Sequence, residues 1–208
     1  MRMQGTLAAL MLLLHSGENR QLPGSPNLNH SFHLHGTVFW SSEGCAELVL
    51  DNTQIIKTVR LHPNSNYELD LPVGTWTMTM PNSSYKRVFQ VLTEKDVKLD
   101  ISCPEPTRSY RYFDMPAEGK GLYDLLVVYD DYWWNPWQHY FFKGINRPAH
   151  AEYNLTTIYA DHIFVKKKES TLKVDGAVTI EDGTGAVKNF HLAVLQLKNG
   201  TVRIVKAE

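Results

Sequence analysis

The last fifty residues, Tyr159 to Glu208, constrain the fold more than any other part of the chain. From Leu172 to Ile180, apolar or small residues alternate with mostly polar ones, which is the two-residue period of a half-buried strand. The segment from Glu181 to Gly185 is rich in residues that tolerate positive φ, and Asn199-Gly200 is a strong hairpin signal. The pattern therefore predicts strand, turn, strand, turn, strand, and an all-β fold.

The N-terminal half shows the same alternation in short segments. Tyr67, Leu69 and Leu71 alternate with acidic residues, and a second alternating run begins at Trp76 after a turn at residues 72–74. Short strands separated by turns at this spacing favour a sandwich or barrel. Residues 32–103 are therefore expected to form a seven-stranded β-sandwich. After a stiff break at residues 104–106, residues 107–208 are expected to form an antiparallel meander or jelly-roll-like module.

The N-terminus has the composition of an export signal. A positively charged start is followed by a nearly continuous apolar run from Leu7 to Leu14, too short to span a bilayer as a helix. Residues 1–17 are therefore expected to be a signal peptide and residues 18–31 a flexible lead-in. No other apolar run is long enough for a transmembrane helix, so we expect an exported, periplasmic or extracellular protein.

Two cysteines, Cys45 and Cys103, bracket the expected sandwich. Cys103 is in phase with the apolar positions Val97, Leu99 and Ile101, which predicts that its thiol points inward. In an exported protein such a pair favours a disulfide. The alternative is a pair of buried free thiols.

The overall charge excludes a general attraction to polyanions. The formal net charge is -1, with 21 basic and 22 acidic residues, so no general attraction to nucleic acid or to an anionic membrane is expected. The run Lys166-Lys167-Lys168 is expected to be a solvated strand end or hairpin tip.

Two segments resemble known families. The first consists of His35–Val38, Ala46–Leu50, Tyr67–Trp76, Tyr85 and Leu99–Ile101. It resembles carboxypeptidase-regulatory-like (CnaB or transthyretin-like) domains, most closely in the turn from Leu71 to Trp76. The second consists of Tyr159–Ile163, Leu172–Gly183 and Leu195–Gly200. It is similar to OstA/LptA-type lipopolysaccharide-transport repeats, but it occurs once where transport proteins stack several. Together they imply an exported bacterial β protein and supply no catalytic residue.

His33 and His35 are the weak candidates for a metal site. The segment from His30 to Gly36 resembles the copper-ligand motif of multicopper oxidases, and imidazoles suit copper or zinc. Those oxidases also need a downstream His-Cys-His cluster, which this chain lacks. The favoured expectation is therefore a pair of solvent-facing histidines and no metal or other cofactor.

The segment from Tyr129 to Phe142 is densely aromatic, and within it Trp133, Trp134, Trp137 and Tyr140 are the candidate ligand-binding residues. Three interpretations stay open: packing in a core or between domains, a lipid- or glycan-binding surface, and an oligomer interface. Adjacent tryptophans on a strand point to opposite faces. We therefore expect one of Trp133 and Trp134 to be buried and the other exposed.

No catalytic motif stands out. Nucleophile-elbow, P-loop, dinucleotide and zinc-protease patterns are missing from the sequence, and acidic groups such as Asp130-Asp131 near His139 are expected to be solvated turn residues. The chain is therefore expected to be a non-enzymatic structural or ligand-binding protein of the cell envelope, with lipid, glycan or an envelope protein as its partner. One alternative is a secreted eukaryotic glycoprotein using sequons at Asn29, Asn82, Asn154 and Asn199. The other is a small metal protein or hydrolase.

Overall fold

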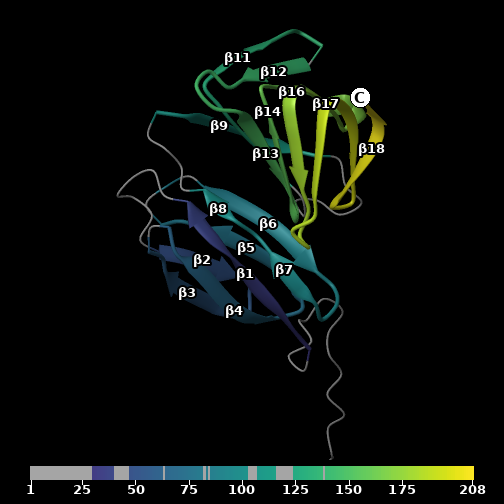
Figure 1. Ribbon diagram of the computed structural model, residues 1–208. Coiled ribbons are helices and arrows are strands. Elements are labelled where there is room, and N and C mark those ends of the chain that lie inside the picture. The colour runs from purple at the N-terminus through teal and green to yellow at the C-terminus, as the bar shows by residue number, and fades with distance from the viewer. Residues whose placement is uncertain are drawn as a thin grey trace, which may run out of the picture.

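The computed structural model describes residues 30–39, 47–62, 64–81, 83, 85–102, 107–115, 124–137 and 139–208, and in them the chain is all-β, as predicted. The strands form three sheets (Figure 1). The helical structure in this part of the chain is one 3-10 turn, Lys167–Glu169.

The first two sheets pack face to face as a sandwich. One contains β1 (Ser31–Phe39), β4 (Asn66–Pro72), β7 (Asp96–Lys98) and β8 (Ile101–Ser102). The other contains β2 (Glu47–Asp51), β3 (Ile56–Arg60), β5 (Gly74–Thr79) and β6 (Lys86–Val91). Leu34, Leu48, Trp76 and Phe89 are fully buried between them, so the alternating apolar residues supply the core, as the two-residue period requires.

The described part of the sandwich has eight strands rather than seven because the last expected strand is divided. β7 and β8 both pair in parallel with β1, but Leu99 and Asp100 between them belong to neither strand. Gly36 lies at this break, where an added Cβ would be 2.0 Å from the carbonyl oxygen of Leu99. Only glycine permits so close an approach of two backbones.

The third sheet is antiparallel throughout its described pairs. Its strands are β9 (Ser109–Asp114), β10 (Asp124–Tyr129), β11 (Asp131–Trp134), β12 (His139–Lys143), β13 (Ala149–Tyr153), β14 (Thr156–Ala160), β15 (His162–Lys166), β16 (Thr171–Glu181), β17 (Val187–Lys198) and β18 (Thr201–Ala207). The long strand β16 organises the sheet. Its first half pairs with β15, its second half with β14, and its other edge with β17.

A bulge at Gly176 lets β16 change partners. The β16–β17 register shifts between Asp175 and Val178, and Gly176 has φ +92°. The carboxylate of Asp161, between β14 and β15, accepts a hydrogen bond from the amide of Ala177 at 3.2 Å. A Cβ on Gly176 would lie 2.2 Å from that carboxylate, so both the backbone conformation and the space require glycine.

The two C-terminal turns form where the sequence predicts them. Asn199 and Gly200 connect β17 to β18 with φ of 48° and 76°, the left-handed pair that a tight hairpin needs. The β16–β17 connection is closed by a hydrogen bond from the amide of Asp182 to the carbonyl of Ala186 at 3.1 Å. Asn154, in the β13–β14 turn, donates to the carbonyl of Gly200 at 2.8 Å and so holds the β17–β18 turn against that neighbour.

The sandwich and the third sheet pack against each other through a shared strand. Leu125 and Val127 of β10 lie in the core of the third sheet, whereas Leu126 and Val128 lie in the core of the sandwich. Both faces of β10 are therefore buried, and Figure 1 shows the two parts in contact along this region.

A buried polar network joins the same two parts. Arg87 of β6 and Glu152 of β13 are 3% and 4% exposed and form an ion pair at 3.3 Å. The hydroxyl of Tyr85 donates to Glu152 at 2.9 Å, and Nε of Arg87 donates to the carbonyl of Asn154 at 2.9 Å. Burial first, and then Glu152, raise the pKa of Tyr85 well above its ordinary value, so that hydroxyl remains a donor.

Several expectations fall outside the described residues. These are the signal peptide at residues 1–17, nearly all of the lead-in at residues 18–31, and both Cys45 and Cys103. Export, the disulfide and the domain boundaries therefore stay predictions.

Candidate functional site

The two candidate metal-binding histidines share one half-exposed face of β1. The rings of His33 and His35 are stacked, with centroids 5.7 Å apart. Nδ1 of His33 lies 3.0 Å from a carboxylate oxygen of Asp70, and this hydrogen bond raises the pKa of His33. His35 lines a shallow pocket together with Lys98. His33 is therefore held by an acidic neighbour, and His35 lies near an ammonium on the same surface.

The described residues contain no cluster of three or more side chains suited to a metal ion. The carboxylates of Asp130 and Glu152 already have structural partners. Asp130 accepts a hydrogen bond from Arg108 at 3.0 Å and another from the amide of Ile145 at 2.8 Å. Glu152, which lies 3.5 Å from His150, is held by Arg87 in the buried network.

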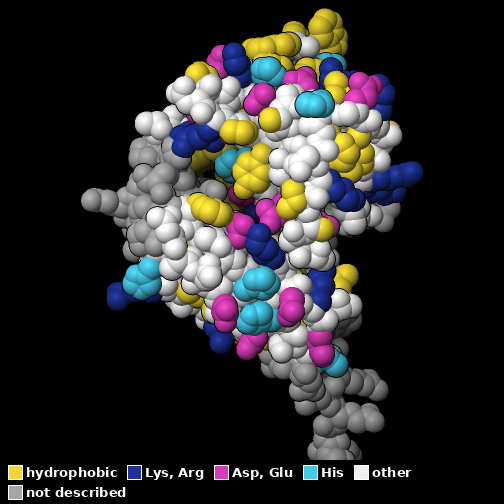
Figure 2. All heavy atoms as spheres, viewed as in Figure 1, with side chains coloured by type: hydrophobic (Ala, Val, Ile, Leu, Met, Phe, Trp, Pro, Cys, Tyr) yellow, Lys and Arg dark blue, Asp and Glu magenta, His cyan; other side chains and the backbone are white. Residues whose placement is uncertain are grey.

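The aromatic segment forms a hairpin at the edge of the third sheet. β11 and β12 pair in register, so that Trp133 faces Phe141 and Trp134 faces Tyr140. The rings of Trp133 and Phe141 are stacked at 5.5 Å, and Trp137 lies in the turn. Figure 2 shows hydrophobic side chains gathered at the upper end of the molecule, where Figure 1 places this hairpin.

The expectation that one of the two adjacent tryptophans is buried is wrong. Trp133 is 52% exposed and Trp134 is 60% exposed, and Trp137 in the turn is 70% exposed. β11 pairs with β12 only, among the described strands. Because it is an edge strand beyond the margin of the core, both of its faces meet solvent. Core packing is therefore excluded for these three tryptophans.

Tyr140 differs from the tryptophans because it is half-buried at the margin of the core. Its ring lies edge-on to Phe113 with centroids 4.9 Å apart, and the guanidinium of Arg111 lies 4.7 Å from its centroid. A cation over an aromatic face is a stabilising contact. Tyr140 therefore anchors the hairpin to the module, and the exposed tryptophans extend beyond it.

Replacing either Trp133 or Trp134 by Ala is expected to lower the free energy of unfolding by less than about 1 kcal/mol, as for exposed positions. Replacing Phe142, which is fully buried on β12, is the matched comparison and is expected to cost about 3–5 kcal/mol. Urea unfolding of the three variants gives the measurement. A loss above about 2 kcal/mol for either tryptophan would mean that the hairpin is packed.

Strand pairing places the aromatic residues beside basic ones on the outer face of the sheet. Directly paired residues point to the same side of an antiparallel sheet. One row runs from Trp133 through Phe141 and Phe164 to Lys173. The next runs from His139 through Lys166, Thr171 and Gln196 to Arg203. We call Trp133, Phe141, Phe164, Lys166, Lys173 and Arg203 the aromatic–basic face.

The basic residues of this face differ in how they are paired. Lys166 forms an ion pair with Glu169 at 3.2 Å. Lys173 and Arg203 are exposed and form no ion pair with another described residue. Lys168, in the 3-10 turn that follows β15, is also exposed. The lysine run therefore ends a strand, as expected, and lies next to the aromatic hairpin because β15 pairs with β12.

Sequence reasoning found the aromatic hairpin but missed the cationic half of this face. The signal is present in the two-residue alternation of β15, β16 and β18, where Lys166, Lys173 and Arg203 occupy outward positions. It becomes visible only when the order of the strands is known.

No family model matches the chain, and no curated protein matches its sequence. Among solved structures, the chain is similar to a DUF3823 family protein from Bacteroides ovatus, with 12% sequence identity and a TM-score of 0.29. The alignment covers 79% of this chain and 97% of that one. A likeness of this degree decides neither fold nor function. In the described residues, no helix has the length and apolar character needed to cross a membrane.

Proposed function

We propose that the chain is an exported, non-enzymatic protein of the bacterial cell envelope that docks on anionic lipid surfaces through its aromatic–basic face. The observation that carries the proposal is the placement of the exposed Trp133 on the same face of the sheet as Lys173 and Arg203, which form no ion pair with another described residue. Tryptophan is enriched at the boundary between lipid and water because its ring is amphipathic. Basic residues near an anionic membrane each contribute about 1 kcal/mol.

The sequence resemblances support the location in the envelope. The carboxypeptidase-regulatory-like segment matches β1 to β8 in position, and the OstA/LptA-like segment covers β15 to β17. The proposal includes a disulfide between Cys45 and Cys103, which suits an oxidising compartment.

The expected interaction is weak, reversible and sensitive to salt. Lys173 and Arg203 supply a small number of surface charges, and a Debye length of about 8 Å at physiological ionic strength screens charges that stay far from the membrane. A stable anchor would need a second signal. Docking through this face therefore suits a protein that contacts the membrane surface transiently.

The test measures sedimentation of the full chain with vesicles of phosphatidylcholine, alone or mixed with phosphatidylglycerol. Binding is expected only to the anionic vesicles and to fall as salt rises. The double charge reversal Lys173→Glu/Arg203→Glu is expected to weaken binding more than about tenfold, because each residue changes from attraction to repulsion. Trp133→Ala/Trp137→Ala is expected to weaken binding without changing the thermal melt.

Matched variants lie on β3 of the sandwich. Lys57→Glu/Arg60→Glu makes the same change of charge at two exposed positions, and Ile56→Ala removes an apolar side chain that is 69% exposed. Neither is expected to alter vesicle binding. Lipid docking would be refuted if the chain bound neutral and anionic vesicles equally, or if the β3 variants weakened binding as much as the variants of the aromatic–basic face. Binding to polysaccharides but not to vesicles would also refute it.

A further inference from the structure

A groove opens on the inner side of the curled C-terminal strands. It encloses about 410 Å³ and is lined by residues of β14, the β16–β17 hairpin and β18. This volume is in the range of small-molecule sites. The lining residues are Thr156, Ile180, Asp182, Ala186, Lys188, Val202, Arg203 and Ile204. Of these residues only Arg203 also belongs to the aromatic–basic face, and none belongs to the aromatic hairpin.

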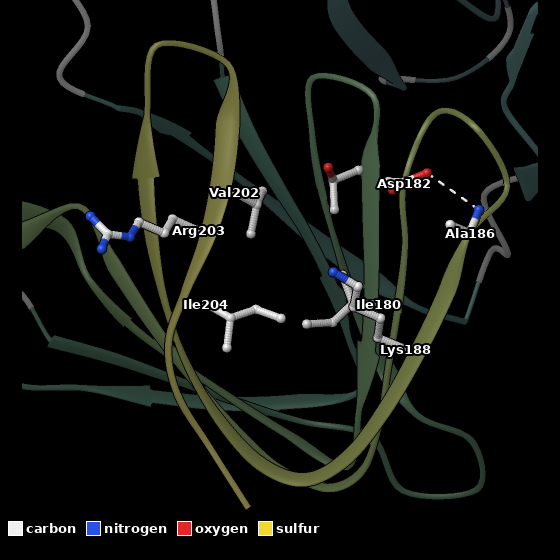
Figure 3. A pocket seen from close by; sticks show the side chains of 8 residues that line it. Ile180, Asp182, Ala186, Lys188, Val202, Arg203 and Ile204 are labelled. Carbon is white, nitrogen blue, oxygen red and sulfur yellow. Dashed lines mark hydrogen bonds between the residues drawn. The ribbon is translucent and has the colours of Figure 1, made fainter.

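Part of the groove wall is aliphatic, formed by Ile180, Val202 and Ile204. Figure 3 shows Val202 and Ile204 on one side facing Ile180 on the other, whereas the side chain of Arg203 points away. Val202 and Ile204 are half-buried and pack against the core of the third sheet. The aliphatic side chains of Ile180, Val202 and Ile204 suit a hydrocarbon chain, because removing apolar surface from water is favourable.

The charged side chains of the groove differ in whether they already have hydrogen-bond partners. Asp182 accepts hydrogen bonds from the amide and hydroxyl of Thr184 at 2.9 and 2.6 Å and from the amide of Ala186 at 3.3 Å. All three bonds go to one carboxylate oxygen, Oδ1, which thereby closes the hairpin. Lys188 is the cross-strand partner of Ile180, and its side chain lies on the Ile180 side of the groove (Figure 3). The pKa of Asp182 is lowered from its ordinary value. Burial opposes this lowering, whereas the hydrogen bonds from Thr184 and Ala186, and after them the ammonium of Lys188, favour it.

Lys188 is exposed and forms no ion pair or hydrogen bond with another described residue. The exposed ammonium of Lys188, together with three aliphatic side chains of the lining, is complementary to a ligand with an anionic head and an apolar tail. From this geometry we infer that the groove is a binding site for a saturated fatty acid, with its chain between Ile180, Val202 and Ile204 and its carboxylate on Lys188. This inference does not depend on docking through the aromatic–basic face.

The experiment is a calorimetric titration of the full chain with decanoate at concentrations below micelle formation. Decyltrimethylammonium, with the same chain and a cationic head, is the matched ligand. Decanoate is expected to bind at one site and the cation at least tenfold more weakly. Lys188→Gln is expected to weaken decanoate binding at least fivefold. Lys173→Gln, at an exposed position on the outer face of β16, is expected to leave it unchanged.

A second pair of variants tests the walls. Ile204→Trp is expected to fill the groove and abolish binding, whereas Val205→Trp, at the next and more exposed position of β18, should bind decanoate like the wild type. Thermal melts check that both fold; if Ile204→Trp does not, the Lys188→Gln comparison decides. The assignment would be overturned if decanoate binding were undetectable or if decyltrimethylammonium bound as tightly as decanoate. It would also be overturned if Lys188→Gln bound decanoate with wild-type affinity.

Discussion

Replacing Arg87 by Ala is expected to lower the free energy of unfolding by about 3–5 kcal/mol, the usual cost of removing one partner from a buried ion pair. The cost arises mainly from Glu152, which would stay ionised and buried without a countercharge. Arg87 also donates to the carbonyls of Asn154 and Thr156 at 2.9 and 3.3 Å. Those acceptors would lose their partner as well, and an unsatisfied buried polar group is unfavourable.

The matched control is Arg60→Ala on β3, where the side chain is exposed, and a change within about 0.5 kcal/mol is expected there. The double variant Arg87→Met/Glu152→Met removes both charges together. It should be more stable than Arg87→Ala, because an uncompensated charge costs more than a missing pair. Urea unfolding of all four proteins gives the values. A double variant no more stable than the single one would show that the ion pair is not the source of the loss.

Acid is expected to destabilise the protein through the same carboxylate. Burial alone would raise the pKa of Glu152, but the charge of Arg87 and hydrogen bonds from His150 and Tyr85 outweigh it and lower the pKa from 4.5 to about 2. A carboxylate with a lowered folded-state pKa binds its proton more readily in the unfolded chain. Its stabilisation is therefore present above pH about 4.5 and is lost as the pH falls toward 2.

A lowering of this size corresponds to about 3 kcal/mol of stability, at about 1.4 kcal/mol per pKa unit. Chemical unfolding between pH 2.5 and 7 measures it. Glu152→Gln is expected to be less stable than wild type at pH 7 and to approach it as the pH falls. Glu47→Gln, at an exposed position on β2, should follow the wild-type curve. Parallel curves for wild type and Glu152→Gln would mean that Glu152 does not carry this dependence.

Local sequence patterns were sufficient for the all-β class and for the two C-terminal turns. Alternation from Leu172 to Ile180 reports on one strand and the single face that it buries. The left-handed residues Asn199 and Gly200 are selected by the turn itself. Neither signal depends on a distant part of the chain, so both can be recognised without knowing which strands are neighbours.

The exposure of both Trp133 and Trp134 could not be predicted from local sequence patterns. Alternation correctly places Trp133 and Trp134 on opposite faces of β11, but it does not state that β11 is an edge strand. In the interior of the sheet one of the two would contact the core. At the edge both are exposed, and this difference is the whole basis for considering the hairpin as a binding surface.

Local patterns were enough to locate strand-forming segments, the alternation of their two faces and the C-terminal turns. Which of those faces lie together depends on the folded arrangement of the strands. The Arg87–Glu152 pair, the row from Trp133 to Lys173 and the groove beneath Lys188 each join residues from strands that are separated in sequence. The physical reason is that strand order is set by the joint burial of all apolar faces, a property of the whole chain that no local period encodes.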